Sequence, residues 1–390
     1  MQRVYLDNAA TTRVRPEAVQ AMLPYFTEIY GNPSSLHTFA QEAAKGVADA
    51  RSSVAQALHA ASPEEIIFTG GGSESDNMVL RGIAQAYAKK GRHIITSAVE
   101  HHAVLHTLQA MEREGIVEVT YLPVDADGKV SVESVAAAIR PDTILVSIMF
   151  ANNEVGTIMP IPEIGRVCHE KGVLFHTDAV QAVGHVPIDV QQMQIDLLSL
   201  SAHKFHGPKG VGALYVKKGV RLPALILGGG QERKKRAGTE NVPGIVGLGV
   251  AISHAVEHME ENAAHMRALR DRLIAGIPAA IPDVKLNGHP TDRLPNNVNF
   301  SIRYIEGESI LLMLDINGIA ASSGSACTSG SLDPSHVLLA MGLTHEVAHG
   351  SLRLSLSEYT TEQEIDYVLE LLPKIVERLR AMSPLYHGGK

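Results

Sequence analysis

The sequence contains few cysteines, no long hydrophobic run and no excess of basic residues. Cys168 and Cys327 are the two cysteines among 390 residues, too few for a disulfide framework and typical of a protein in a reducing cytoplasm. The apolar run at residues 143–151 is well short of the ~20 residues that a membrane-spanning helix needs. Lys and Arg number 34 against 42 Asp and Glu, a net charge of −8, whereas nucleic-acid binding favours a basic surface. We therefore expect neither a membrane nor a nucleic-acid partner.

The composition is that of a folded globular protein, with 45% hydrophobic and 19% charged residues. The N-terminal residues MQRVYLDNAATTRV lack the apolar core of a signal peptide, which also favours a cytoplasmic location. A chain of this length buries enough apolar surface to fold without disulfides or structural metals. One large domain or two domains are expected.

Residues 66–201 alternate short apolar segments, predicted to be strands, with segments of helical periodicity. The predicted strands are residues 66–70, 93–99, 117–124, 143–151, 173–176 and 197–201, and the helices are residues 73–89, a segment from about 103, 132–139 and 164–171. Several of these strands are apolar on both faces. The pattern indicates an α/β fold with a mostly parallel sheet that helices cover on both sides.

The pattern changes near Gly244. We expect one long helix at residues 251–277, then a strand at 298–302, a helix at 309–314, a strand near 352–356 and a last helix to about 382. The last helix opens with Thr361-x-x-Glu364, the signature of a capping box. These segments predict a large domain at residues 14–250 and a smaller α+β domain formed by residues 1–13 and 251–390.

Lys204 and Asp178 are the first candidates for chemistry. Lys204 follows the strand at residues 197–201, and Asp178 ends the strand VLFHTD; α/β sheets bind ligands at the carboxyl ends of their strands. A desolvated lysine is a nucleophilic amine that can form a Schiff base. Pyridoxal phosphate chemistry needs such a lysine and an acidic partner for the pyridine nitrogen. Alone, Lys204 also fits a surface turn and Asp178 a helix cap; together they favour a pyridoxal phosphate site.

A glycine-rich turn, Gly70-Gly71-Gly72-Ser73, joins the first predicted strand to a helix. Glycines let the backbone approach an anion, and free N–H groups at a helix start bind phosphate, although ordinary turn chemistry explains most such runs. The turn lacks the Walker lysine and the G-x-G-x-x-G spacing. Binding of nucleoside triphosphates or dinucleotides is therefore disfavoured.

The two cysteines stand in contrasting surroundings. Cys327 lies in ASSGSACTSGS, a run of small and polar residues that predicts a flexible, exposed loop and a thiol kept for its reactivity. Cys168 lies at an apolar position of the helical segment EIGRVCHEKG. We predict that Cys168 packs in the core.

These features belong to a set of motifs that resembles the cysteine desulfurases of the NifS/IscS family, which are class V, fold-type I enzymes dependent on pyridoxal phosphate. The motifs include YLDNAATT, YGNPSSLH, ANNEVG, HTDAVQAVG, SAHKFHGPKG, RAGTEN and SSGSACTSGSLDPSH, and they span nearly the whole chain. Several of them are closer to the NifS branch. The resemblance implies a homodimer, a large cofactor-binding domain with a mostly parallel seven-stranded sheet, and a small domain that carries the catalytic cysteine loop at about residues 321–332.

The resemblance also implies a role for each matching residue. Lys204 is the Schiff-base lysine, Asp178 contacts the pyridine nitrogen, and His101 stacks on the ring and moves protons. Asn153 and Arg353 position the substrate, since a bidentate arginine suits a carboxylate. Cys327 is the nucleophile that receives sulfur. The remaining cofactor-binding residues that it implies are Gly72, Ser73, Gln181, Ser201, His203 and, reaching across the dimer, Thr239 of the partner subunit, with Asn153 contributing to both groups.

The implied reaction converts L-cysteine to L-alanine and leaves a persulfide on Cys327. A sulfur-acceptor protein such as an iron–sulfur scaffold then takes the sulfur, for general iron–sulfur assembly or for nitrogenase maturation. No stable metal site is expected, because the 19 histidines do not show zinc-site spacing; the metal contact implied is a transient one between Cys327 and a scaffold's iron–sulfur cluster.

Three alternatives remain open. A selenocysteine lyase shares the same residues, so it is the hardest to separate. An aminotransferase of the same fold needs no thiol, so Cys327 argues against it. A non-catalytic assembly scaffold would have no reason to keep Lys204 and Asp178 together with His101.

Overall fold

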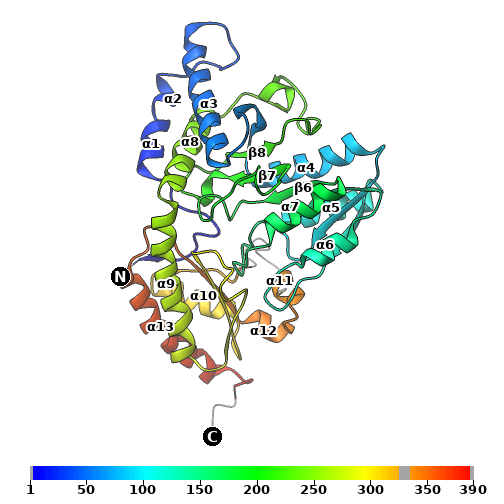
Figure 1. Ribbon diagram of the computed structural model, residues 1–390. Helices are drawn as coiled ribbons and strands as arrows, with labels where there is room; N and C mark the ends of the chain where they lie inside the picture. Colours follow the sequence, from blue (N-terminus) through cyan, green and yellow to red (C-terminus); the bar gives the residue numbers. More distant parts are fainter. Residues whose placement is uncertain (1–2, 325–333, 387–390) are drawn as a thin grey trace.

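A single sheet forms the centre of the larger part of the molecule. In the computed structural model, which describes residues 3–324 and 334–386, seven strands form this sheet (Figure 1). Their order is β2 (Ile66–Thr69), β8 (Gly212–Val216), β7 (Leu197–Ser201), β6 (Leu174–Asp178), β5 (Thr143–Ser147), β3 (His93–Ser97) and β4 (Glu118–Leu122). Strand β8 runs antiparallel to both neighbours, and the other pairs are parallel. The predicted mostly parallel seven-stranded sheet is confirmed, with β8 as the strand that the segment predictions missed.

Helices cover both faces of the sheet because its strands are apolar on both sides. Ile94 packs with α4 (Gly72–Tyr87) and α5 (His102–Arg113) on one face. Its neighbour Ile95 points the other way, into the core formed with four further helices, as the period of two along a strand requires. These are α3 (Thr38–Ala57), α6 (Val132–Ala138), α7 (Ile161–Lys171) and α8 (Val242–Glu257). Residues 16–57, for which no helix was predicted, form α1 (Pro16–Met22), α2 (Pro24–Thr27) and α3.

A second hydrophobic core lies beside the first. It is built on an antiparallel sheet of β11 (Val284–Leu286), β12 (Asn297–Ile302) and β14 (Ser351–Ser355), with α9 (Met259–Ala280), α10 (Gly307–Ile316) and α13 (Glu362–Met382). Val4 and Leu6 join this core from the N-terminus, where β1 (Val4–Tyr5) pairs with β13 (Ile319–Ala320). Thr361 and Glu364 form the predicted capping box at the start of α13.

The predicted single helix at residues 251–277 is wrong. Helix α8 ends at Glu257, α9 begins at Met259, and the two axes differ by 72°. The bend lets α8 bury residues as far as Ala255 in the large core while α9 packs in the small one. The predicted domain boundary at residues 250–251 lies inside α8. Two short helices late in the chain, α11 (His336–Ala340) and α12 (His345–His349), also pack on the large core.

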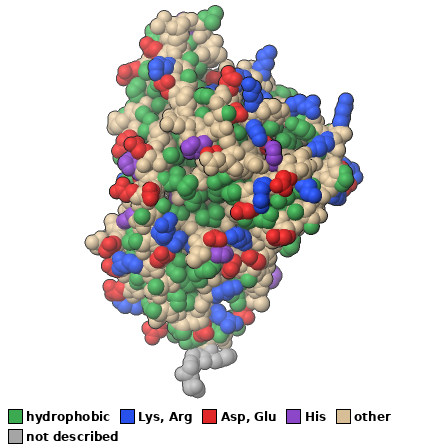
Figure 2. All heavy atoms as spheres, viewed as in Figure 1, with side chains coloured by type: hydrophobic (Ala, Val, Ile, Leu, Met, Phe, Trp, Pro, Cys, Tyr) green, Lys and Arg blue, Asp and Glu red, His purple; other side chains and the backbone are tan. Residues whose placement is uncertain are grey.

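The charge distribution on the surface and the lengths of the helices are relevant to nucleic-acid and membrane partners. Acidic and basic side chains are interspersed on the face that Figure 2 shows. Among the described residues, no single helix has both the length and the apolar composition of a membrane span, although the bent pair of α8 and α9 meets these criteria jointly.

A short hairpin of β9 (Gly230–Gln231) and β10 (Arg236–Ala237) leads to Thr239.

Candidate active site

A cavity of about 320 Å³ lies at the carboxyl ends of β5, β6 and β7, where α/β sheets bind ligands. The predicted site residues that line it are Gly72, Ser73, His101, Asn153, Asp178, Gln181, Ser201, His203, Lys204 and Arg353. Thr239 lies elsewhere, exposed after β10. Cys327 lies outside the described residues.

Lys204 is held in the cavity by the N-terminal segment. It lies in a short 3₁₀ turn after β7, and its Nζ donates hydrogen bonds to the carbonyl oxygens of Ala9 at 2.5 Å and Ala10 at 2.8 Å. Gln181 Nε2 donates to the same Ala9 oxygen at 2.9 Å. Two residues that the resemblance assigns to the cofactor therefore share one backbone acceptor.

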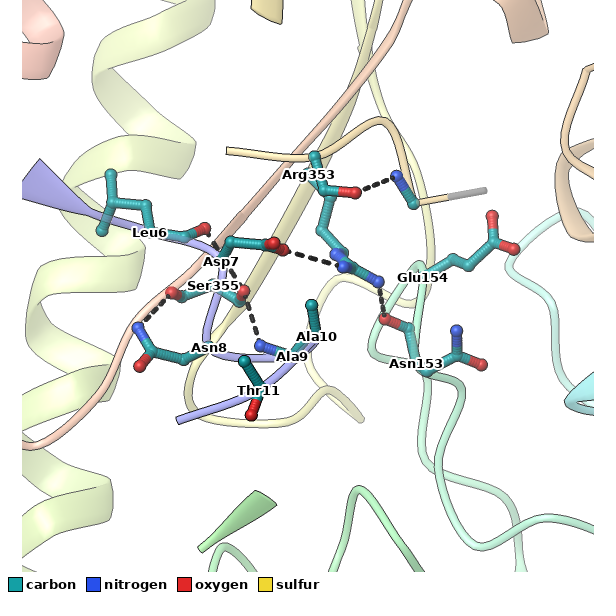
Figure 3. Close-up of polar contacts among 12 residues, drawn as sticks. Leu6, Asp7, Asn8, Ala9, Ala10, Thr11, Asn153, Glu154, Arg353 and Ser355 are labelled. Atoms are coloured by element: carbon teal, nitrogen blue, oxygen red, sulfur yellow. Dashed lines mark hydrogen bonds and ion pairs between the residues drawn. The ribbon is translucent and has the colours of Figure 1, made fainter. Parts of the chain in front are cut away.

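The segment after β1 is part of the site, although no role was predicted for it. Ser355 of β14 fixes it, because its Oγ accepts from Ala9 N at 2.9 Å and its carbonyl oxygen accepts from Asn8 Nδ2 at 2.8 Å (Figure 3). Thr11 Oγ1 lies 3.1 Å from His203 Nδ1. The signal in the sequence was the run of two small residues in DNAATT, since small side chains let a backbone approach other groups closely.

Asp178 is a buried acid at the end of β6. Its Oδ1 accepts a hydrogen bond from Val180 N at 2.9 Å. Burial raises its pKa to about 6, while the Val180 N–H and the positive charge of Lys204 lower it. A cation bound beside Asp178 would therefore favour the ionised form of this carboxyl group.

A second buried acid, Asp76 of α4, lines the same cavity and was not predicted. Burial and the negative charge of Asp178 raise its pKa well above the usual range. Its Oδ1 has no hydrogen-bond partner in the described part of the chain and lies 3.7 Å from His176 Nε2. Two neighbouring buried carboxyl groups resist carrying two negative charges, so a proton on Asp76 leaves Asp178 as the anion.

His101 is a neutral imidazole at the start of α5. Burial lowers its pKa to about 4, and the positive charge of Lys204 adds to this effect. Its Nδ1 accepts a hydrogen bond from Ala103 N at 3.1 Å. The neutral ring therefore carries its proton on Nε2.

The start of α4 forms one end of the cavity. Gly71, its N-cap, has a φ of 150° and caps the helix with no side chain, while a Cβ added to Gly72 would lie 2.6 Å from Val180 Cγ2. The glycines therefore allow close backbone approach. The adjoining recess is lined by Ser73, Ser201, His203 and a lysine that was not predicted, Lys209.

Arg353 of β14 presents a buried, incompletely bonded guanidinium. Its Nη1 donates to the carbonyl oxygen of Asn153 at 2.9 Å, and its Nη2 pairs with Asp7 Oδ1 at 3.0 Å (Figure 3). Its Nε is buried and has no partner among the described residues. Arg353 lines the cavity, and its guanidinium suits an anionic ligand such as a carboxylate.

Comparison with known proteins places these residues in a family. The Aminotransferase class-V family matches residues 4–368. The chain belongs to this family. It is 62% identical over 388 residues to "Cysteine desulfurase IscS" of Clostridium botulinum, covering 99% of this chain and 97% of that protein. It is 59% identical over 382 residues to the protein of the same name from Methanosarcina thermophila, covering 98% and 94%. The solved structure of a "NifS-like protein" matches with a TM-score of 0.91 at 42% identity, covering 97% of this chain and all of that one.

The cofactor of this class V family is pyridoxal 5′-phosphate, and the cavity fits it. Backbone and hydroxyl donors at the start of α4, with Ser201 and His203, would hold the phosphate. Asp178 would hold the ring nitrogen in its protonated form, and Lys204 would supply the amine for the aldehyde. Within the described ranges, no group of three or more His, Cys, Asp or Glu side chains is arranged to hold a metal ion.

Proposed function

We propose that this chain is a cysteine desulfurase that converts L-cysteine to L-alanine and holds the sulfur as a persulfide on Cys327. The observation that carries the proposal is the convergence of Lys204, Asp178 and Arg353 on one cavity. The curated relatives named above, which are cysteine desulfurases by name, support it. The sequence of this chain also retains Cys327.

Each residue has a task that follows from its surroundings. The bound cofactor supplies an electron sink that stabilises negative charge at the substrate Cα. Arg353 binds the substrate carboxylate, and Asn153 lies beside it in the cavity lining. Lys204, released from the Ala9 and Ala10 carbonyls, takes the Cα proton. His101, neutral and protonated on Nε2, is placed to exchange a proton with the substrate thiol.

Sulfur transfer needs an attacking thiolate. The Cys327 thiolate forms a bond to the substrate sulfur, and the C–S bond of the substrate breaks. The electron pair of that bond stays with the carbon fragment, which takes up protons and leaves as alanine. The sulfur remains on Cys327 for an acceptor protein, which we propose to be an iron–sulfur scaffold in the cytoplasm, for general assembly or nitrogenase maturation.

A homodimer is part of the proposal. Exposed apolar side chains gather between the end of α1 and the first turn of α3: Leu23, Phe26, Tyr30, Leu36 and Phe39. Gln231 Nε2 donates to Ser34 Oγ at 3.2 Å, which joins this surface to the hairpin that precedes Thr239. In the proposed dimer, Thr239 of the partner subunit contributes to the phosphate recess. The double variant Leu36→Asp, Phe26→Asp should give a single-chain mass in light scattering and weaker cofactor binding; a wild-type single-chain mass with full activity would refute the dimer.

The activity itself is tested by product analysis. Purified protein loaded with pyridoxal phosphate is given L-cysteine, and alanine and sulfide are measured with and without a reductant. Alanine formed in equal amount to sulfide supports the desulfurase. Faster alanine release from L-selenocysteine than from L-cysteine would favour a selenocysteine lyase. Alanine that forms only when pyruvate is added as the amino acceptor, without sulfide, would favour an aminotransferase. A colourless, inactive protein that still binds a scaffold would favour the non-catalytic alternative.

A further inference from the structure

Glu154 is a buried carboxyl group to which the proposed reaction assigns no role. It follows Asn153 in the loop between β5 and α7 and is 3% exposed. Its backbone is held from both sides: its N–H donates to Asn152 Oδ1 at 2.9 Å, and its carbonyl oxygen accepts from Asn299 Nδ2 of β12 at 3.0 Å. The loop is thereby fixed between the large core and the small one.

The carboxylate of Glu154 holds the start of α11. Ser335, the N-cap of α11, donates its hydroxyl proton to Glu154 Oε2 at 2.5 Å while its Oγ accepts from Leu338 N at 3.2 Å. His336 Nε2 lies 3.0 Å from the carbonyl oxygen of Glu100. Burial raises the pKa of Glu154, and the Ser335 hydroxyl and the positive charge of Arg353 oppose this shift without cancelling it.

The same carboxylate packs against Gly324. A Cβ added to Gly324 would lie 3.1 Å from Glu154 Oε2, and the φ of 94° at this residue favours glycine. Gly324 lines the cavity, and its N–H donates to Ser322 Oγ at 3.1 Å. Ser322 pairs in turn with the backbone of Arg353. Figure 3 shows Glu154 next to Asn153, whose carbonyl oxygen receives Arg353.

Glu154 Oε2 therefore accepts a hydrogen bond from Ser335 and occupies the space that a side chain at residue 324 would enter, so it lies beside residues that flank the interval 325–333, in which Cys327 stands. We propose that Glu154 is a positioning residue for the nucleophile: its carboxylate sets the separation of Gly324 and Ser335 and aligns both with Arg353. The inference rests on the proposed function, in which Cys327 attacks sulfur bound beside Arg353. The Glu154 side chain suits this task because one of its oxygens accepts the short hydrogen bond from Ser335 while it packs beside Gly324.

The test uses three variants of the full-length holoenzyme. Glu154→Ala removes both contacts, Glu154→Gln keeps an oxygen that accepts the Ser335 hydroxyl, and Ser335→Ala removes the donor while leaving the carboxylate. We expect Glu154→Ala and Ser335→Ala to lower kcat for alanine release by about 10- to 100-fold, the scale set by a misplacement of about 1 Å. The KM for L-cysteine should change little, because Arg353 and Lys204 remain. Glu154→Gln should stay much closer to wild type.

A second readout does not depend on turnover. The rate of Cys327 alkylation by iodoacetamide, followed by mass spectrometry of its peptide, should rise in Glu154→Ala and Ser335→Ala and stay near the wild-type rate in Glu154→Gln. Thr344→Ala is the matched control, since Thr344 caps α12 by accepting from Val347 N and lies outside the site. It should leave both readouts unchanged.

The outcomes separate this inference from the proposed function. Unchanged kcat and unchanged alkylation in a folded Glu154→Ala or Ser335→Ala protein would overturn the positioning role. So would an equal loss in Glu154→Gln, or an equal loss in Thr344→Ala. If the wild-type enzyme releases alanine and Cys327→Ala does not, the proposed function stands whatever the Glu154 variants do. If the wild type releases no alanine, it is the proposed function that fails.

Discussion

Arg353 Nη2 lies 3.0 Å from Asp7 Oδ1, which joins a strand of the small core to a segment 346 residues away in sequence (Figure 3). The pair is asymmetric, because Arg353 is 3% exposed and the Asp7 side chain is 23% exposed. Asp7 neutralises part of the guanidinium charge and fixes the orientation of its N–H donors, while Nε is buried without a hydrogen-bond partner among the described residues. The ion pair therefore orients an arginine for a second carboxylate.

Substitution of Arg353 should weaken substrate binding. Arg353→Ala is expected to raise the KM for L-cysteine by about 10- to 100-fold, since hydrogen bonds to charged groups contribute about 1.5–3 kcal/mol. Arg353→Lys should recover little of this loss, because a lysine cannot form the bidentate contact. Asp7→Asn keeps an acceptor for Nη2 and removes a competing negative charge, so its KM should not rise. Steady-state kinetics check all three, and a normal KM in Arg353→Ala would exclude Arg353 from carboxylate binding.

Lys204 should be needed for both colour and turnover. Lys204→Ala removes the amine that holds the cofactor, so the purified protein should lose the visible absorbance of the wild type and release no alanine. Lys209→Ala is a useful comparison, because Lys209 lines the adjoining recess and is not among the residues that line the cavity with Lys204. It should keep the visible band and at most bind the cofactor more weakly. A borohydride-reducible link to the cofactor in Lys204→Ala would contradict the assignment.

The sequence predicted the parts of the fold and site that local pattern controls. Strands such as residues 197–201 are uniformly apolar, and Asp178 and Lys204 end or follow such strands, so their meeting at one sheet edge could be foreseen. The bend at His258 could not, because it carries no proline or glycine and follows from two cores that each need a helix. The Asp7–Arg353 and Glu154–Ser335 contacts were also missed. Each joins residues far apart in sequence, and local pattern carries no information about such pairs.

Glu100 should make stability depend on pH. Burial raises its pKa to about 8, whereas an unfolded glutamate titrates near ~4.3. The folded chain then keeps a proton that the unfolded chain releases, so Glu100 destabilises the fold increasingly as pH rises from about 4.3 to about 8. Glu100→Gln cannot ionise at this position. The difference between its free energy of unfolding and that of wild type should therefore increase by up to about 1.4 kcal/mol per pH unit across this window.

Urea unfolding at pH 5, 6.5 and 8 measures this gain. Glu377→Gln, an exposed substitution of the same chemistry, is the control and should give a constant difference from wild type. A Glu100→Gln difference that does not change with pH would show that Glu100 is ionised in the folded protein.

The two cysteines are expected to differ in role, with Cys168 structural and Cys327 catalytic. Cys168 of α7 is fully buried in the core, as predicted, and burial raises the pKa of its thiol to about 12. The thiolate is the nucleophile, so Cys168 is inert in the folded protein. Cys168→Ala should keep near-normal turnover and lose about 1 kcal/mol of stability, a typical cost for a small core truncation.

Cys327→Ala should behave in the opposite way. Cofactor binding needs Lys204 and the cavity rather than this thiol, so the variant should keep its visible absorbance and still change its spectrum when L-cysteine is added. It should release almost no alanine, because the C–S bond breaks only when a thiolate accepts the sulfur. After L-cysteine is added to wild type, mass spectrometry should find one extra sulfur on the peptide that contains Cys327. Full alanine release by Cys327→Ala would show that a group other than Cys327 attacks the substrate sulfur. Sulfur found on Cys168 would contradict the assignment in the same way, and it would also require α7 to open, because the Cys168 thiol is buried and its pKa is raised.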